Sequence, residues 1–319
     1  MRGADVEEKR KLRVALLAGG KSGERDVSLD GAKGVAQALD PEKFVVKQYD
    51  TASDLEALVA DAPAIDFAFI LLHGLLGEDG TVQGFLELLG IPYQGSGVLG
   101  SALAMDKNLA KEMYRLHGLP VADWEMVDVR GGTTASELIE RLGLPLVVKP
   151  ICQGSSIGMT IARTAEDLAT GIKVALAHDS RVMVEQFIAG REVTAGVLGN
   201  DVPVALPLVE IIPGEEYDFF DYTAKYKPGA TREICPAPLD ESLAARAQQY
   251  GLAAHRALQL RGYSRTDMIL TQEGRFVLLE TNTIPGMTAT SLFPQAAAAY
   301  GLPFPVLLET LIELGMQSK

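Results

Sequence analysis

Two acidic residues that face each other across a predicted hairpin are the strongest chemical signal in the sequence. Residues 264–282, SRTDMILTQEGRFVLLETN, hold two apolar runs on either side of the Glu-Gly pair at 273–274. That pattern predicts two antiparallel strands joined by a two-residue turn. Counting outward from the turn places Asp267 directly opposite Glu280. Because directly opposed like charges destabilise a sheet, the pair predicts a cation between the two carboxylates.

The same register places Arg265 opposite Asn282, on the face that carries both acids. Carboxylate and amide oxygens suit Mg²⁺, which completes its shell with water and substrate phosphates. The alternative is a solvated hairpin face with incidental acids, but the other residues of both strands are largely apolar, which indicates a buried hairpin. We therefore predict that Asp267, Glu280 and Asn282 hold magnesium.

A lysine followed by a glycine- and serine-rich loop gives a second signal, KPICQGSSIG at residues 149–158. Such a loop can cover phosphates with backbone N–H groups, hydroxyls and one fixed charge. Alone it resembles an ordinary turn, but beside a magnesium hairpin it predicts a nucleotide site. The GGKS at residues 19–22 is no second phosphate loop, because the phosphate-loop pattern requires glycine where Ala15 stands. We interpret Lys21 as a solvated turn residue.

Composition limits the class of protein. The 319 residues allow two or three domains, and 47% hydrophobic with 22% charged residues is typical of a globular protein. The net charge of −13 argues against nucleic acid or an anionic membrane as partner. Cys152 and Cys235 are too few for a disulfide framework and fit a reducing compartment. No run approaches the roughly 20 apolar residues of a membrane span, so we expect a cytoplasmic protein.

The elements that must position these residues follow from periodicity. Apolar runs at residues 13–19, 44–49 and 66–73 alternate with helical patterns, one starting near Ser28 and one at a capping box on Ser53. Alternating strands and helices predict a parallel α/β sheet to about residue 105, with a ligand crevice at the carboxyl ends of its strands. AGGKSGE and HGLLGEDG both lie at such ends.

Two α+β units follow. A helix ending at Gly118 leads to strands, with a capped helix from Thr164 between them. A second group of strands precedes a polar loop at 213–231, a long helix at 240–261, the hairpin and a C-terminal helix. The predicted strands of the two units are at residues 144–150, 159–162, 181–188, 191–199 and 202–211. We expect three regions, at residues 1–105, 106–192 and 193–319.

Seven stretches in this order resemble the D-alanine–D-alanine ligases, an ATP-grasp family. They are GGKSGERDVSL, HGLLGEDGTVQG, MDKNLAK, KPICQGSSIGM, FFDYTAKY, SRTDM and LLETNTIPGMTATSL, and they span nearly the whole chain. The resemblance implies an N-terminal parallel α/β (pre-ATP-grasp) domain followed by a two-subdomain α+β ATP-grasp fold. It implies that ATP drives the joining of two D-alanines through an acyl phosphate, for peptidoglycan synthesis. ATP, two Mg²⁺ ions that Mn²⁺ can replace, and a homodimer belong to that pattern.

The resemblance also implies site residues. The catalytic set is Glu24, Ser155, Tyr226, Arg265 and Gly286. The substrate-binding set is Glu24, His73, Arg265, Gly286, Ser291 and Leu292. The ATP-binding set is Lys107, Lys149, Ser155, Ser156, Glu185, Gln186, Ile188, Glu192, Phe219, Lys225 and Asn282. The metal set is Asp267, Glu280 and Asn282, in agreement with the hairpin register.

Several of these positions have a stated role in the resemblance. Glu24 receives the ammonium of the first D-alanine, and Arg265 stabilises the transferred phosphoryl group. Phe219 covers adenine. Gln186 stands where lysine is common, so its adenine contact would come from the backbone. Thr266, between Arg265 and Asp267, is expected to point to the other face of the hairpin.

Three other functions compete with this interpretation. A different ATP-grasp ligase would share the nucleotide and metal residues, and Glu24, Tyr226 and Ser291 argue against it. A D-alanine–D-lactate ligase commonly has histidine where this chain has Tyr226. A small-molecule sensor would explain the α/β region at residues 1–105, but not a hairpin with two opposed acids.

Overall fold

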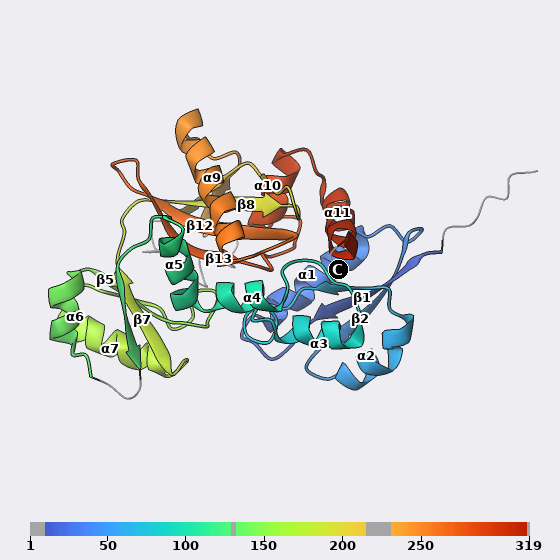
Figure 1. Ribbon diagram of the computed structural model, residues 1–319, viewed down its shortest axis with the longest axis horizontal. Helices are drawn as coiled ribbons and strands as arrows, with labels where there is room; N and C mark the ends of the chain where they lie inside the picture. Colours follow the sequence, from blue (N-terminus) through green and yellow to red (C-terminus); the bar gives the residue numbers. More distant parts are fainter. Residues whose placement is uncertain (1–9, 129–131, 215–230, 318–319) are drawn as a thin grey trace, which may run out of the picture.

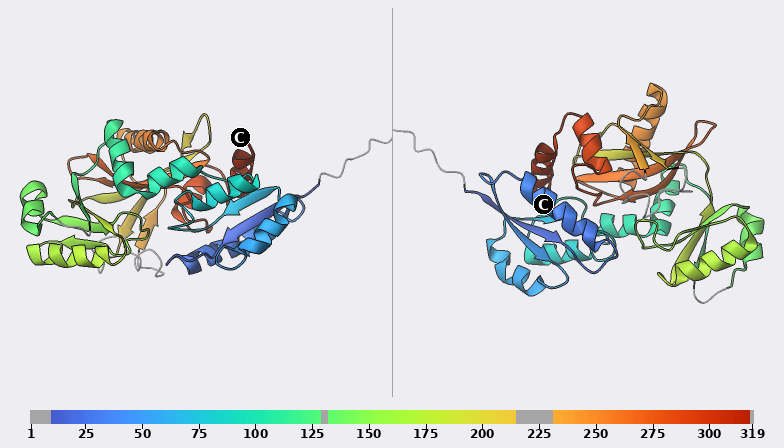
Figure 2. Two further views of the ribbon diagram at one scale, coloured as in Figure 1. Left: turned by 60° about the horizontal axis from the view of Figure 1, so that its bottom comes forward. Right: turned by 180° about the vertical axis from the view of Figure 1, so that it is seen from behind.

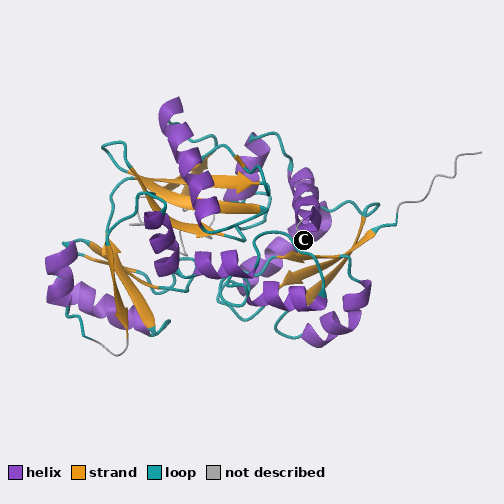
Figure 3. Cartoon of the chain, in the orientation of Figure 1, coloured by secondary structure: helices purple, strands orange, loops and turns teal. Residues whose placement is uncertain are grey.

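The computed structural model describes residues 10–128, 132–214 and 231–317, and in these ranges the strands form three sheets (Figure 1, Figure 3). The first sheet is parallel, with strand order β2-β1-β3. Its strands are β1 (Leu12–Ala18), β2 (Phe44–Asp50) and β3 (Phe67–Ile70). Its helical segments are α1 (Arg25–Ala38), α2 (Leu55–Asp61), η1 (Ala62–Ala64), α3 (Thr81–Leu89) and α4 (Val98–Met105). The predicted parallel α/β region is confirmed.

Two of the predicted helix starts are wrong, and side-chain hydrogen bonds explain both. The Ser28 hydroxyl accepts from the Gly19 N–H at 2.8 Å and so stabilises the loop between β1 and α1, which is called the first loop below. The helix α1 begins earlier, at Arg25. Ser53 does not cap α2, because Asp54 is the N-cap and receives the Ser53 hydroxyl at 2.8 Å. At Thr164 the predicted capping box is present, and it starts the helix α7 (Ala165–Leu176).

The second sheet is antiparallel, with order β4-β7-β5-β6. Its strands are β4 (Trp124–Asp128), β5 (Leu146–Pro150), β6 (Thr160–Ala162) and β7 (Arg181–Gln186). α6 (Ala135–Leu142) and α7 pack on it around a core that includes Leu138, Val148, Leu168 and Val184. β4 and α6 were not predicted from the sequence.

The third sheet is antiparallel and carries the predicted hairpin. Its order is β11-β10-β8-β12-β13, with β9 paired to β8. The strands are β8 (Arg191–Leu198), β9 (Val204–Ala205), β10 (Val209–Pro213), β11 (Thr231–Ile234), β12 (Tyr263–Leu270) and β13 (Phe276–Asn282). α9 (Glu241–Ala257) packs on one face of this sheet. The strand predicted at residues 202–211 is therefore two strands, since Pro207 lies in the interruption.

The C-terminal segment is two helices, α10 (Leu292–Ala299) and α11 (Phe304–Gln317), rather than the one predicted. Gly301, with φ of +99°, and Pro303 separate them. α11 returns to pack against α1 and β3 (Figure 2). Among the described residues, no single helix is long and apolar enough to cross a membrane; α10 and α11 reach that length and composition only together, across a 100° bend.

One helix connects the second and third sheets. α5 (Lys107–Leu116) lies between them and contacts β13 and α9 (Figure 1). Asp106 caps its first turn by accepting from the Leu109 N–H at 3.0 Å. The residues on the buried side of α5 can therefore reach both sheets.

Candidate active site

The hairpin brings its polar residues together as predicted. Asp267 is paired with Glu280, and Arg265 with Asn282, across β12 and β13. The predicted turn is wrong, however, because the Thr271 N–H donates to the Arg275 carbonyl at 2.8 Å, which closes a loop of residues 272–274. A register shift next to Asp267 compensates for the additional turn residue and restores the predicted pairs.

Both hairpin acids already have a cationic partner from the protein. Arg265 donates twice to Asp267, at 2.8 Å each, and the Asn282 amide donates to the same carboxylate at 3.1 Å. The Lys107 ammonium lies 2.8 Å from a Glu280 oxygen. Burial lowers the pKa of Arg265, but the adjacent Asp267 carboxylate outweighs burial and raises that pKa above its ordinary value. Each of the two carboxylates is thus paired with a cationic side chain of the protein.

This donor set fits a divalent cation. Two carboxylates and one amide oxygen suit Mg²⁺ and leave positions for water and phosphates. In the described part of the chain, no group of three or more His, Cys, Asp or Glu side chains is arranged to hold a metal. The set predicted at the hairpin is not such a group, since its third member is the amide Asn282.

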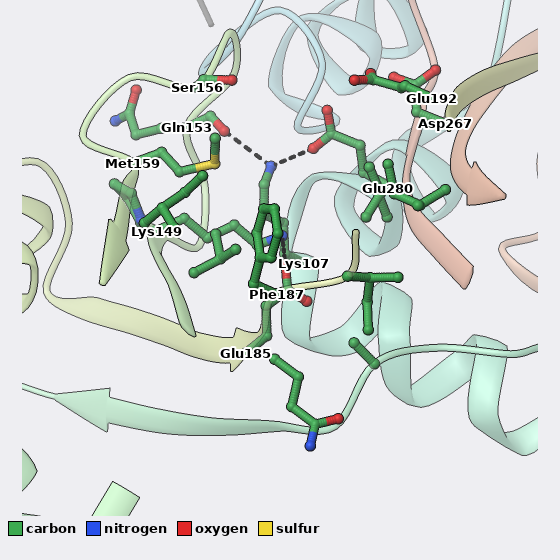
Figure 4. Close-up of a pocket in the computed structure, with 18 of the residues that line it drawn as sticks. Lys107, Lys149, Gln153, Ser156, Met159, Glu185, Phe187, Glu192, Asp267 and Glu280 are labelled. Carbon is green, nitrogen blue, oxygen red and sulfur yellow. Dashed lines mark hydrogen bonds and ion pairs between the residues drawn. The ribbon is translucent and has the colours of Figure 1, made fainter. Parts of the chain in front are cut away.

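A pocket of about 150 Å³ lies between the second and third sheets (Figure 4). Its lining contains most of the predicted nucleotide and metal residues: Lys107, Lys149, Ser156, Glu185, Gln186, Ile188, Glu192, Asp267 and Glu280. The Lys107 ammonium bridges two groups, because it donates to the Gln153 carbonyl at 3.0 Å as well as to Glu280. Residues 149–158, which are predicted to cover phosphates, are called the phosphate loop below. This loop, α5 and the hairpin therefore meet at the Lys107 ammonium group.

The apolar side chains of this pocket were not predicted from the sequence. Phe187, Met159, Ile161, Ile269 and Leu279 line it and supply surfaces on which a flat base can pack. Phe187 sits between two predicted residues in the run VEQFI, so its position was the available signal. Leu279 turns toward the pocket at the register shift, which hairpin alternation could not foresee.

Gln186 is the last residue of β7. Its side chain donates to the Leu142 carbonyl at 3.0 Å and so is engaged by α6. An adenine contact through the backbone at this position stays a prediction. Phe219, Lys225 and Tyr226 lie outside the described residues.

Glu24 connects the first loop to the phosphate loop. The Ser155 hydroxyl donates to its carboxylate, and both residues are buried. A side chain at Gly154 would place its Cβ 2.8 Å from the same carboxylate, so this close approach requires glycine. Ser155 and Ser156 have φ of +50° and +57°, a conformation that non-glycine residues rarely adopt outside functional loops.

His73 is buried at the carboxyl end of the first sheet and is hydrogen-bonded to the backbone of Ile284. Burial lowers the pKa of His73 and Arg265 adds to that lowering, while Glu24 opposes it. Glu78, which the sequence analysis missed, lies nearby and accepts from the Gly74 N–H at 2.7 Å. Burial, reinforced by Glu24, raises the pKa of Glu78 to about 8. Its place in HGLLGEDG was the signal for it.

The predicted second-substrate residues form one turn before α10. Ser291 is the N-cap residue, and its hydroxyl lies 2.7 Å from the Thr288 hydroxyl. A Cβ added at Gly286 would lie 3.1 Å from the same Ser291 oxygen, so the two residues adjoin. Leu292 is the first residue of α10, where a backbone N–H attracts anions.

Three further residues lie close to the predicted site residues in the sequence. Lys21 is exposed, as predicted for a turn residue. The Thr266 hydroxyl bonds to that of Thr281 at 2.9 Å on the face away from Asp267, also as predicted. Lys111 was missed, although it lies in the quoted stretch MDKNLAK, and it is fully buried against Glu185.

Known proteins share this arrangement over nearly the full chain. A family model described as D-ala D-ala ligase C-terminus matches residues 113–313, and one described as D-ala D-ala ligase N-terminus matches residues 51–96. A D-alanine--D-alanine ligase of Desulfotalea psychrophila is 62% identical over 308 residues, which are 96% of each chain.

Solved structures agree. D-alanine--D-alanine ligase from Bacillus anthracis complexed with ATP matches with a TM-score of 0.84 and 34% identity, covering 96% of this chain and 98% of that one. The VanG D-Ala:D-Ser ligase from Enterococcus faecalis matches with a TM-score of 0.83 and 32% identity, covering 96% of this chain and 100% of that one. With the fold, the sequence and the family models in agreement, the chain belongs to the D-alanine–D-alanine ligase family.

Proposed function

We propose that the pocket between the second and third sheets, extended by Glu24 and His73, is where this chain joins two D-alanines at the expense of ATP. The supporting observation is convergence: the Lys107 and Lys149 ammonium groups and the opposed acids Asp267 and Glu280 line one pocket. Positive charge for phosphates and oxygen ligands for a metal are the two requirements of phosphoryl transfer. The product is the D-alanyl-D-alanine of peptidoglycan precursors.

We further propose that Asp267, Glu280 and Asn282 hold magnesium, with two ions bound and Mn²⁺ able to replace them. When bound, the metal neutralises phosphate charge during transfer of the terminal phosphoryl group. Lys107 bonds to Glu280 in this structure and lies within the same pocket. It is therefore positioned to exchange that carboxylate for a nucleotide phosphate.

The chain's own residues account for the remaining steps. Glu24 holds the ammonium of the first D-alanine. The carboxylate of that D-alanine can then attack the terminal phosphorus of ATP and release ADP. The amine of the second D-alanine then attacks the acyl phosphate carbon, and inorganic phosphate leaves. Arg265 stabilises the negative charge that develops at both stages. The Leu292 N–H and Ser291 bind the second carboxylate, which fixes the direction of attack.

The closing of the site also falls to protein loops. An acyl phosphate is hydrolysed by water, so the phosphate loop must cover it. The sequence places a second loop, which includes Phe219, Lys225 and Tyr226, in the same task. We propose that the phosphate loop becomes more ordered when nucleotide binds.

The test of this function is a matched pair of substitutions on the hairpin. Glu280→Gln removes a metal ligand with little change in shape, whereas Glu273→Gln removes an exposed charge at the hairpin tip. We expect Glu280→Gln to lower D-alanine-dependent ATP hydrolysis by about 100-fold, and Glu273→Gln to retain it. Near-normal turnover by Glu280→Gln at ordinary Mg²⁺ would contradict the metal assignment.

The assembly and the location are proposals of the same kind. We propose a homodimer that acts on small molecules in the cytoplasm, without nucleic acid or membrane partners. Both cysteines are free thiols, as expected in a reducing compartment. We also propose that the boundaries near residues 105 and 192 separate three domains, each with one sheet.

A further inference from the structure

Three charged side chains are gathered at the wall of the nucleotide pocket. Lys111 and Lys149 both donate to the Glu185 carboxylate, Lys111 at 2.6 Å. Their exposed fractions are 0% for Lys111, 8% for Lys149 and 3% for Glu185. Glu185 and Lys149 line the pocket, whereas Lys111 stands behind them on α5.

The arrangement is held by packing as well as by charge. Lys111 lies four residues after Lys107, so both project from one side of α5. Its ammonium is 5.0 Å from the centre of the Trp124 ring, and Trp124 is paired with Glu185 across β4 and β7. The Trp124 indole N–H donates to the Asn108 side chain at 2.8 Å, which fixes the ring to the same helix.

The charge balance of this cluster gives Lys111 its importance. Burial alone would raise the pKa of Glu185, but Lys149 and Lys111 lower it to about 2, so the group is a carboxylate. One carboxylate and two ammonium groups leave a net charge of +1. If Lys111 were absent, Glu185 would cancel Lys149, and the pocket wall would present no net charge to an anion.

We propose that Lys111 is a positioning residue that balances the charge of Glu185, so that Lys149 remains an effective cation for the di- or triphosphate of a bound nucleotide. The inference rests on the proposed nucleotide site and names a part of it that does not touch the ligand. The buried position matters, because a charge in a poorly solvated environment acts at longer range than one in water.

A purely structural role for Lys111 gives a different expectation. If the residue only filled space and satisfied Glu185, its loss would disturb the pocket for every ligand alike. An electrostatic role instead affects nucleotides according to their charge. The ratio of ATP affinity to adenosine affinity therefore distinguishes the two roles, since it cancels changes in the adenine contacts.

The experiment compares four forms of the cluster, which have three different net charges, by calorimetric titration with ATP, ADP and adenosine. Lys111→Met leaves a net charge of 0, the unmodified chain has +1, Lys111→Met with Glu185→Gln restores +1, and Glu185→Gln alone has +2. We expect Lys111→Met to lower the ATP-to-adenosine affinity ratio about 10-fold, the double substitution to restore it, and Glu185→Gln to raise it. Lys173→Met, which removes an exposed lysine of α7, is the control and should leave the ratio unchanged.

Two outcomes have separate meanings. If Lys149→Met leaves ATP affinity unchanged, the proposed nucleotide site itself is wrong. If Lys149→Met weakens ATP binding but Lys111→Met changes ATP and adenosine affinity equally, or the double substitution fails to restore the ratio, the charge-balancing role is overturned. Should Lys111→Met not fold, the comparison of Glu185→Gln with the unmodified chain still decides, because the proposal requires a higher ratio in Glu185→Gln.

Discussion

Two neighbouring serines of the phosphate loop have different partners. Ser155 is buried and donates to Glu24 of the loop between β1 and α1, whereas Ser156 lines the pocket between the second and third sheets. The positive φ of both residues turns successive side chains toward these two sites. In the proposed function, this one loop contacts both the amino-acid site and the nucleotide site.

We expect the two serines to affect different kinetic constants. Ser155→Ala removes the hydrogen bond that holds Glu24 and should raise KM for D-alanine about 10-fold, since a hydrogen bond to a charged group contributes roughly 1.5–3 kcal/mol. Ser156→Ala should instead raise KM for ATP. Steady-state kinetics with each substrate varied in turn gives both constants. A change in the same constant for both variants would show that the loop acts as one unit.

Single residues also mark the limit of what the sequence could predict. The pairing of Asp267 with Glu280, and of Arg265 with Asn282, could be predicted because hairpin pairing is a local rule. Lys111 could not, because a helix lysine is ordinarily exposed, and only the packing of α5 against β4 and β7 buries it. Glu78 was missed for the same reason, since its environment comes from segments distant in sequence.

At the scale of elements, the hairpin was predicted with two errors that cancel. The turn contains residues 272–274 rather than two residues, with Gly274 at φ of +75°. Leu279 is the additional residue on β13, where the register shifts beside Asp267. Turn type and register shifts depend on neighbouring elements; here the Leu278 N–H donates at 2.8 Å to the carbonyl of Pro120, outside the sheet. The hydropathy pattern of the hairpin cannot predict that hydrogen bond.

The loop between β3 and α3 provides a pH-dependent prediction. Burial and Glu24 raise the pKa of Glu78 from 4.5 to about 8, so between these values the folded state binds a proton that the unfolded chain has lost. The stabilisation from this proton is complete below pH 4.5 and is lost as the pH rises through 8. Glu78→Gln cannot ionise. At pH 8.5 its free energy of unfolding should therefore exceed that of the unmodified chain by about 4–5 kcal/mol, and near pH 5 the two values should differ by less than about 1 kcal/mol.

Urea titrations at the two pH values measure this difference. Glu273→Gln is the control, because Glu273 is exposed and its pKa is lowered by its hydrogen bond to Thr271. It should give no gain in stability at pH 8.5. An advantage of Glu78→Gln that is the same at both pH values would exclude the titration of Glu78 as its cause.

At the scale of the whole molecule, the two ends of the described chain share one core. Leu16, Phe69, Leu307 and Leu311 belong to a single buried cluster that also contains Phe293 of α10. The first sheet is thus completed by a helix from the far end of the sequence, as Figure 2 shows for α11 beside the N-terminal elements. The regions predicted from the sequence are consecutive. Periodicity within one region cannot predict that α11 packs against α1 and β3.

This shared core predicts that the first sheet does not unfold by itself. Leu311→Ala removes a fully buried side chain of α11 and should lower the free energy of unfolding by about 2–5 kcal/mol, in one transition that includes the loss of nucleotide binding. Val306→Ala, on the same helix but 46% exposed, should change it by less than about 1 kcal/mol. Circular dichroism and nucleotide fluorescence followed in the same urea titration give the two midpoints. Coincident midpoints are expected, because the cluster also contains residues of α10, the helix that begins at Leu292. Separate midpoints in Leu311→Ala, with nucleotide binding retained after the first, would mean that α11 stabilises the N-terminal sheet alone.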